Sequence, residues 1–128
     1  MGKKNLKFGS LAVHAGQSPD PTTGAIMTPI YQTSTYVQEE PGKIISCCEY
    51  SRSENPTRTA LEKNIAALEQ GKYGICFASG CSALTATLHL LQAEDHVIVG
   101  DDVYGGTLRI FNKLFSHYEQ YFFNSIFT

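Results

Sequence analysis

The sequence predicts an α/β fold built around a parallel sheet and preceded by a long irregular N-terminal segment. From about residue 57 onward, stretches with helical apolar spacing alternate with short apolar runs. The resulting order of helix, strand, helix, strand, helix is typical of crossovers between parallel strands. Before that, proline and glycine recur every few positions in residues 1–56, so this segment is expected to be extended and to pack against something else.

The first helix is expected to begin at Asn55, because asparagine is a favoured N-cap residue. Pro56 then occupies the first turn, where a missing N–H costs no hydrogen bond. Gly71 is expected to end this helix. The apolar residues that continue the helical spacing between these limits are Leu61, Ile65 and Leu68.

Two short apolar runs, residues 73–78 and 96–100, are predicted to be adjacent parallel strands. Helical spacing predicts a helix over residues 82–92 between them and another over residues 107–121. Residues 122–128 are expected to begin a third strand. Because two parallel strands do not complete a sheet, the fold is predicted to be cut short.

Composition favours a soluble globular chain, since 42% of the 128 residues are hydrophobic and 17% are charged. A net charge of −2 argues against nucleic acid or an anionic membrane as partner. No apolar run has the length of a membrane span, so we expect a cytoplasmic protein. The four cysteines include no C-x-x-C pair, and we expect neither a metal site nor a disulfide scaffold.

The residues around Ser79-Gly80 form the most distinctive local motif, Phe77-Ala78-Ser79-Gly80-Cys81-Ser82-Ala83. An apolar run there ends in small residues and passes directly into a helix. The free N–H groups and positive end of a helix attract anions, and glycine lets a phosphate approach the backbone. A plain strand-to-helix turn that binds nothing is the alternative, because the spaced glycines of dinucleotide folds are absent.

Two further loops carry candidate ligand-binding residues. Tyr50-Ser51-Arg52 offers a guanidinium fork and a phenol to a phosphate, although it also fits a solvated loop before a helix. Asp101–Thr107, with Tyr104 and paired glycines, follows the second predicted strand. Ligands bind at that end of open α/β sheets, and a tyrosine ring there can cover an aromatic cofactor or simply pack at the turn. Taken together, the loops suit a phosphorylated aromatic ligand.

These motifs resemble, in order and spacing from about Leu11 to Phe115, the signatures of the pyridoxal-phosphate enzymes of Cys/Met metabolism. The matching segments are Pro29–Tyr36, Tyr50–Arg52 with Asn55–Arg58, Phe77–Gly80 and Asp101–Thr107. The family includes cystathionine γ-synthases, γ-lyases and β-lyases. The resemblance implies an aminotransferase-like, fold type I large domain, of which this chain would hold only an incomplete part of the parallel sheet.

The resemblance also implies roles for five residues in binding pyridoxal 5′-phosphate. The backbone amides of Gly80 and Cys81 would hold the phosphate, and Tyr104 would stack on the pyridine ring. Tyr50 and Arg52 would reach the phosphate bound in a neighbouring subunit of a homo-oligomer. Residues 1–56 would then be an N-terminal arm that packs across subunits, and residues 57–128 the start of the cofactor-binding domain.

Several positions depart from the family pattern. Cys81 replaces a larger apolar residue, and Cys47-Cys48 replaces a glycine followed by an aromatic residue. Glu54 and Glu94 stand where small or glycine residues are usual. If either position requires a positive φ, a glutamate there is expected to destabilise the fold by about 1 kcal/mol.

No catalytic residue of the family has a counterpart in this chain. The aspartate for the pyridine nitrogen, the Schiff-base lysine and the arginine for the substrate carboxylate all fall beyond the matched positions. We therefore expect a fragment of a transsulfuration enzyme acting on sulfur amino acids, with weak or no cofactor binding and no turnover by itself. It would be a truncated product, a piece of a longer chain or a gene remnant.

Two other functions remain open on the sequence. One is a non-catalytic oligomerisation partner that binds a full-length homologue through residues 1–56, and co-purification would reveal it. The other is an unrelated nucleotide-binding α/β domain, which is disfavoured because the glycine spacing of such domains is missing.

Overall fold

The computed structural model describes residues 6–45, 47–92, 94–115 and 121–125, the last of these as backbone. The chain divides into two compact units, Met1–Cys76 and Phe77–Thr128. In the part described, no helix is long and apolar enough to cross a membrane.

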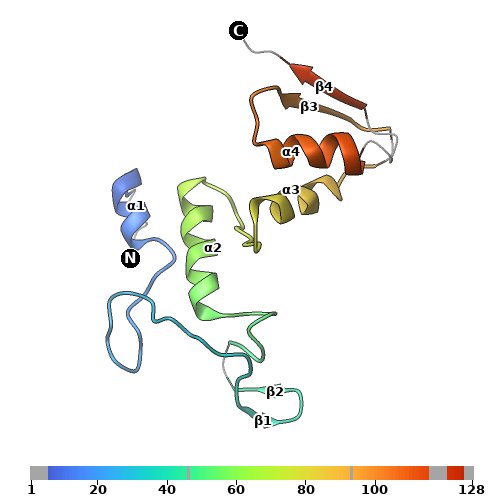
Figure 1. The fold of residues 1–128 in the computed structure, drawn as a ribbon. Helices are drawn as coiled ribbons and strands as arrows, with labels where there is room; N and C mark the ends of the chain where they lie inside the picture. The colour runs from blue at the N-terminus through green and yellow to red at the C-terminus, as the bar shows by residue number, and fades with distance from the viewer. Residues whose placement is uncertain (1–5, 46, 93, 116–120, 126–128) are drawn as a thin grey trace. The chain divides into compact units, whose positions relative to one another are not determined.

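The described residues of the first unit form two helices and a small hairpin (Figure 1). Helix α1 (Phe8–His14) lies beside α2 (Pro56–Leu68). Strands β1 (Gln38–Glu40) and β2 (Lys43–Ile44) are antiparallel. The expectation that residues 1–56 are extended was therefore wrong at α1, whereas β1 and β2 are extended but form a regular hairpin.

Asn64 of α2 explains why α1 can form where the sequence indicated irregular chain. Its side-chain amide donates to the carbonyl oxygens of Leu11, Ala12 and Ala15, at 3.1, 3.2 and 2.9 Å. These carbonyls belong to the C-terminal end of α1, where backbone acceptors lack helical partners. Gly16 follows with φ +74°, and a β-carbon there would lie 2.6 Å from the backbone nitrogen of Asn64. The short helix thus depends on a partner distant in sequence.

Helix α2 begins as predicted. Asn55 is extended (φ −143°), its side-chain oxygen accepts from the N–H of Thr57 at 2.9 Å, and Pro56 is the first helical residue. The helix ends at Leu68, before the expected Gly71. The residue with the left-handed conformation is Gln70 (φ +53°), and the N–H of Gly71 donates to the Ala66 carbonyl at 2.8 Å.

The predicted strand over residues 73–78 is not formed. This segment is irregular, and the side chains of Tyr73 and Ile75 are 74% and 73% exposed. Its predicted pairing with residues 96–100 was wrong, because residues 73–78 form no strand, and residues 96–100 pair with residues 121–125. The amide of Cys76 instead donates to Oε1 of Glu62 on α2, at 3.0 Å. A strand needs a neighbour to satisfy its backbone, and the described residues provide none here.

The second unit carries one parallel pair, although not the pair that the sequence predicted. Strand β3 (His96–Gly100) pairs in parallel with β4 (Tyr121–Ser125), with His96 opposite Tyr121 and Gly100 opposite Ser125. The third predicted strand therefore exists, and it is the neighbour of β3. Residues 126–128, at the end of the predicted strand, lie outside those described.

Among the described residues, three helical segments accompany these strands. Helix α3 (Gly80–Leu88) begins two residues earlier and ends four residues earlier than predicted. Helix α4 (Gly105–Arg109) continues into a π-helical segment, η1 (Ile110–Leu114). Together, α4 and η1 cover the start of the predicted helix 107–121. The residues that form the buried core are Leu88, Val99, Phe111 and Phe115.

Of the two unusual glutamates, only one has a left-handed backbone. Glu94, in the turn between α3 and β3, has φ +73°. A non-glycine residue there costs about 1 kcal/mol relative to glycine. Glu54 has no positive φ, and its N–H donates to the Tyr50 carbonyl at 2.9 Å. The departure at position 54 therefore causes no backbone strain.

Candidate functional site

The start of α3 presents free backbone donors. Ser79 is the N-cap, with an extended backbone (φ −156°, ψ 159°), and its Oγ accepts from the N–H of Ser82 at 3.1 Å. Gly80 and Cys81 are the first two helical residues, whose N–H groups have no intrahelical acceptor. A β-carbon added to Gly80 would meet no atom within 4 Å. An anion can therefore approach this backbone without obstruction.

Tyr104 lies next to this helix start within the second unit. Its side chain is 75% exposed, and it directly precedes α4. A β-carbon added to Gly106 would lie 3.0 Å from Tyr104 Cδ1 and 3.1 Å from Cys81 Sγ. Because Gly106 has no side chain, the Tyr104 ring and the Cys81 side chain can both lie close to its α-carbon. An exposed aromatic face stands beside the free amides.

Tyr50 and Arg52 lie together in the first unit. The Arg52 Cζ atom is 5.0 Å from the centroid of the Tyr50 ring, at cation–π distance. Arg52 is exposed and makes no ion pair with a carboxylate in the described part of the chain. Tyr50 forms an isolated bridge with Thr35. The guanidinium is therefore available to an external anion.

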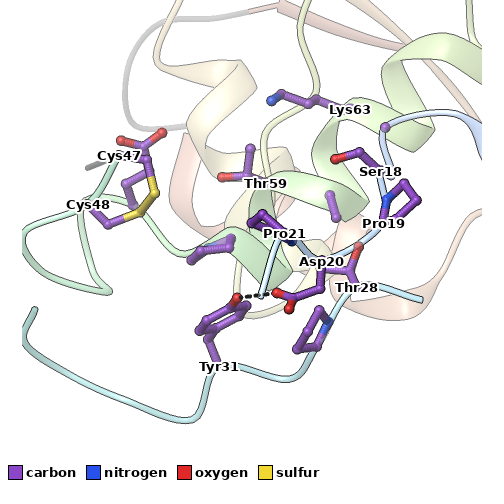
Figure 2. A pocket seen from close by; sticks show the side chains of 15 residues that line it. Ser18, Pro19, Asp20, Pro21, Thr28, Tyr31, Cys47, Cys48, Thr59 and Lys63 are labelled. Carbon is purple, nitrogen blue, oxygen red and sulfur yellow. Dashed lines mark hydrogen bonds between the residues drawn. A yellow bond between two sulfur atoms is a disulfide. The ribbon is translucent and has the colours of Figure 1, made fainter. Parts of the chain in front are cut away.

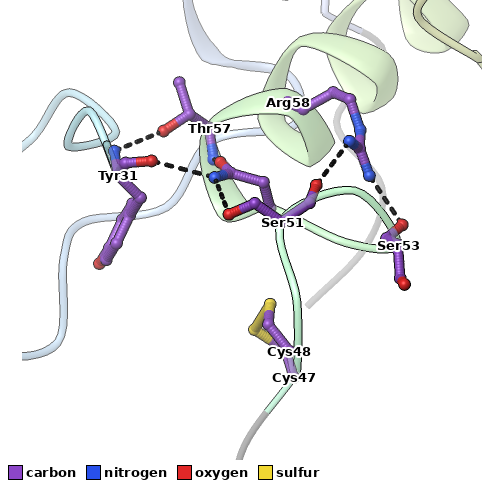
Figure 3. The surroundings of a disulfide bond; sticks show 8 residues. Tyr31, Cys47, Cys48, Ser51, Ser53, Thr57 and Arg58 are labelled. Atoms are coloured by element: carbon purple, nitrogen blue, oxygen red, sulfur yellow. Dashed lines mark hydrogen bonds between the residues drawn. A yellow bond between two sulfur atoms is a disulfide. The ribbon is translucent and has the colours of Figure 1, made fainter. Parts of the chain in front are cut away.

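Residues of the Asn55–Arg58 motif hold the loop that carries Tyr50 and Arg52 (Figure 3). Arg58 donates to the carbonyls of Ser51 at 2.9 Å and Ser53 at 2.7 Å. Asn55 donates to the Tyr31 carbonyl at 3.0 Å and to Ser51 Oγ at 3.1 Å. Because the Arg58 fork is engaged by this loop, its role is structural, whereas Arg52 remains free to bind.

Sequence reasoning did not single out the cavity in the first unit, which has a volume of about 250 Å³ (Figure 2). Its most buried polar residue, Asp20, is 8% exposed. Asp20 Oδ1 accepts from the Thr22 and Thr23 amides at 3.0 and 2.7 Å, and Oδ2 accepts from the Tyr31 hydroxyl at 3.2 Å. The string Asp20–Gly24 was a usable signal, because aspartate and proline before threonines and glycine favour such turns.

Two pKa values in this cavity depart from their ordinary ranges. Hydrogen bonds from Thr23, backbone first and then hydroxyl, lower the pKa of Asp20. Burial, followed by the hydrogen bond to Asp20, raises the pKa of Tyr31. The pair is therefore held as a carboxylate and a neutral phenol.

Cys47 and Cys48 form a disulfide between adjacent residues (Figure 3). Such a bond links neighbouring residues and joins no distant segments of the chain. Cys76 and Cys81 are free thiols. Among the described residues, no group of three His, Cys, Asp or Glu side chains is arranged to hold a metal ion.

Residues 9–124 match the family of Cys/Met metabolism PLP-dependent enzymes, and the chain belongs to this family. It is 57% identical over 111 residues to a cystathionine beta-lyase of Coxiella burnetii, covering 87% of this chain and 28% of that protein. It is 52% identical to a probable cystathionine gamma-synthase of Herpetosiphon aurantiacus, covering 87% of this chain and 34% of that protein. The chain thus spans about a third, or less, of these relatives.

Solved structures show the same relationship. The crystal structure of cystathionine gamma-lyase from Lactobacillus plantarum complexed with L-serine matches with a TM-score of 0.81 and 45% identity, over 94% of this chain and 31% of that one. The crystal structure of metB from Corynebacterium glutamicum matches with a TM-score of 0.87 and 36% identity, over 98% and 33%. The chain therefore has the fold of the N-terminal part of these enzymes, as the sequence predicted.

Proposed function

We propose that this chain supplies the phosphate-binding and ring-stacking part of a pyridoxal-phosphate enzyme that acts on sulfur amino acids. The observation that supports this most directly is the open start of α3, where Gly80 and Cys81 present free amides beside the exposed Tyr104 ring. A helix start of this kind suits a phosphate, and a tyrosine face suits a flat heteroaromatic ring. The residues present therefore fit the cofactor that the family uses.

Each residue of this site has one task in the proposal. The Gly80 and Cys81 amides donate hydrogen bonds to the phosphate, and Ser79 fixes the first turn of α3 through its bond to Ser82. Tyr104 covers one face of the ring. When bound, the cofactor supplies an electron sink for bond cleavage next to the amino-acid α-carbon. The protein contributes position and orientation here.

Tyr50 and Arg52 are proposed to bind the phosphate held by a neighbouring subunit. Arg52 is exposed and free of carboxylate partners in the described residues, and Arg58 stabilises the loop that presents it. Apolar side chains of the proposed arm, residues 1–56, are also exposed, Ile30 at 86% and Val37 at 78%. These features favour a homo-oligomer in which the arm packs across subunits. A cytoplasmic location is part of the same proposal.

The proposed reaction of the parent enzyme is replacement or elimination at the γ- or β-carbon of cystathionine or an O-activated homoserine. The relatives named above include both synthases and lyases, and the residues of this chain are compatible with either activity. The resemblance assigns the Schiff-base role to none of the lysines in this chain. We therefore expect the 128 residues alone to give no turnover.

Phosphate binding at Gly80 can be tested with a donor-deleting substitution that the helix tolerates. Gly80→Pro removes one N–H at the first helical position, where proline is accepted, and the extended Ser79 backbone is compatible with a following proline. Gly80→Ala is the matched control, because it keeps the N–H and its β-carbon enters open space. We expect phosphate affinity, measured by calorimetry or ³¹P NMR, to fall about fivefold in Gly80→Pro only. Equal affinity in the proline variant and the wild type would refute this site.

A further inference from the structure

The Cys47–Cys48 disulfide forms part of the wall of the cavity that also contains Asp20 and Tyr31 (Figure 2). The two sulfur-bearing residues differ in access. Cys47 is exposed, whereas Cys48 is only 2% exposed. Thiol–disulfide exchange requires a nucleophile to reach one particular sulfur, so attack from solvent is directed to Cys47.

The charges around this cavity indicate which thiols it accepts. Its lining residues include Asp20, Glu54 and Lys63, whose side chains carry two carboxylates and one ammonium group. A thiol that carries both an ammonium and a carboxylate group can complement both signs. A thiol whose only other charge is negative faces two carboxylates and one ammonium group. One carboxylate is therefore left unbalanced and repels it. The cavity volume of about 250 Å³ accommodates a molecule the size of an amino acid.

We propose that Cys47 and Cys48 are a redox-active pair that exchanges with small amino-acid thiols through this cavity. The thiolate attacks Cys47 Sγ, a new sulfur–sulfur bond forms there, and the Cys47–Cys48 bond breaks. The electron pair leaves on Cys48, which takes up a proton. A second thiolate then attacks the sulfur of the bound small thiol, releases the small-molecule disulfide and leaves Cys47 as a thiol after protonation. Two small thiols are oxidised and one protein disulfide is reduced.

Tryptic peptides separate this pair from the free cysteines. Cleavage after Lys43 and Arg52 places Cys47 and Cys48 alone in residues 44–52, and the free cysteines lie in residues 73–109. The folded 128-residue chain is treated with cysteine or with 3-mercaptopropionate at equal thiolate concentration, quenched with acid and N-ethylmaleimide, and analysed by mass spectrometry. The same reactions in urea give the reactivity without the cavity.

We expect peptide 44–52 to be two hydrogens lighter before reduction and to carry the mixed disulfide on Cys47. The rate ratio of cysteine to 3-mercaptopropionate should be about threefold higher in the folded chain than in urea, as one unpaired charge nearby implies. Glu54→Gln should reduce this preference, whereas Glu69→Gln, which removes a carboxylate outside the lining, should not.

Three results would overturn the proposal. The first is a peptide 44–52 that stays fully reduced in the folded chain under an excess of cystine. The second is equal adduct formation on both cysteines. The third is a rate ratio that urea leaves unchanged, which would show that the cavity does not select the thiol.

Discussion

Asn55 is expected to make two separable contributions to stability, one at the start of α2 and one to the loop that carries Tyr50 and Arg52. Its side-chain oxygen caps the helix through the Thr57 N–H at 2.9 Å. Its side-chain nitrogen donates to the Tyr31 carbonyl at 3.0 Å and to Ser51 Oγ at 3.1 Å. Asn55→Ala removes both functions. Asn55→Asp keeps the capping oxygen and removes only the donors.

The expected costs follow from these contacts. Loss of the cap destabilises by about 1 kcal/mol, and loss of the partly exposed donor bonds by about another 1 kcal/mol. Asn55→Ala should therefore lower the free energy of unfolding by about 2 kcal/mol, a change of about 30-fold in the unfolding equilibrium. Asn55→Asp should lose about half as much.

Urea unfolding followed by circular dichroism measures the total, and amide exchange at Thr57 and Ser51 assigns it to the two places. In Asn55→Asp, the Thr57 amide should keep its protection while the loop amide of Ser51 loses part of its own. The reasoning would be refuted if the aspartate and alanine variants were equally unstable, since the cap would then contribute nothing. The reasoning would also be refuted if Asn55→Asp were as stable as the wild type, since the donor bonds would then contribute nothing.

Three further outcomes are expected. Gly106→Ala should displace the Tyr104 ring, detected as a changed ring environment by NMR, whereas Gly105→Ala, whose β-carbon meets nothing within 4 Å, should leave the ring in place; an unmoved ring in Gly106→Ala would contradict the contact. The pKa of Asp20 is lowered, so its contribution to stability is present above the ordinary value of 3.8 and disappears as the pH falls below it. The pKa of Tyr31 is raised, so its contribution is present below 10.0 and is lost as the pH rises further. Asp20→Asn should flatten the acid limb of a stability–pH curve, and an unchanged limb would rule out this assignment. Borohydride treatment of the 128-residue chain with pyridoxal phosphate should trap no stoichiometric adduct on any one lysine by mass spectrometry, and a single fully modified lysine would overturn the expectation of an inactive chain.

The sequence by itself determined the features that depend on local chemistry. Asn55 and Pro56 specify the start of α2, because N-capping and proline tolerance act within one turn. The passage from the small residues around Ser79-Gly80 into a helix was also predicted, although α3 begins two residues before the expected residue 82. The apolar run 96–100 became β3, and the family membership that the ordered motifs indicated is confirmed.

The tertiary structure decided what depends on residues distant in the chain. Residues 73–78 are as apolar as a strand, but a strand requires a paired neighbour, and none of the described strands pairs with this segment. Helix α1 forms where Asn64, about fifty positions later, binds its terminal carbonyls. The sequence does not distinguish the guanidinium groups of Arg52 and Arg58. Their contacts do, because Arg58 donates to the carbonyls of Ser51 and Ser53 and so has a structural role, whereas Arg52 is left to bind a ligand. Backbone propensity is local, whereas satisfaction of hydrogen bonds is not.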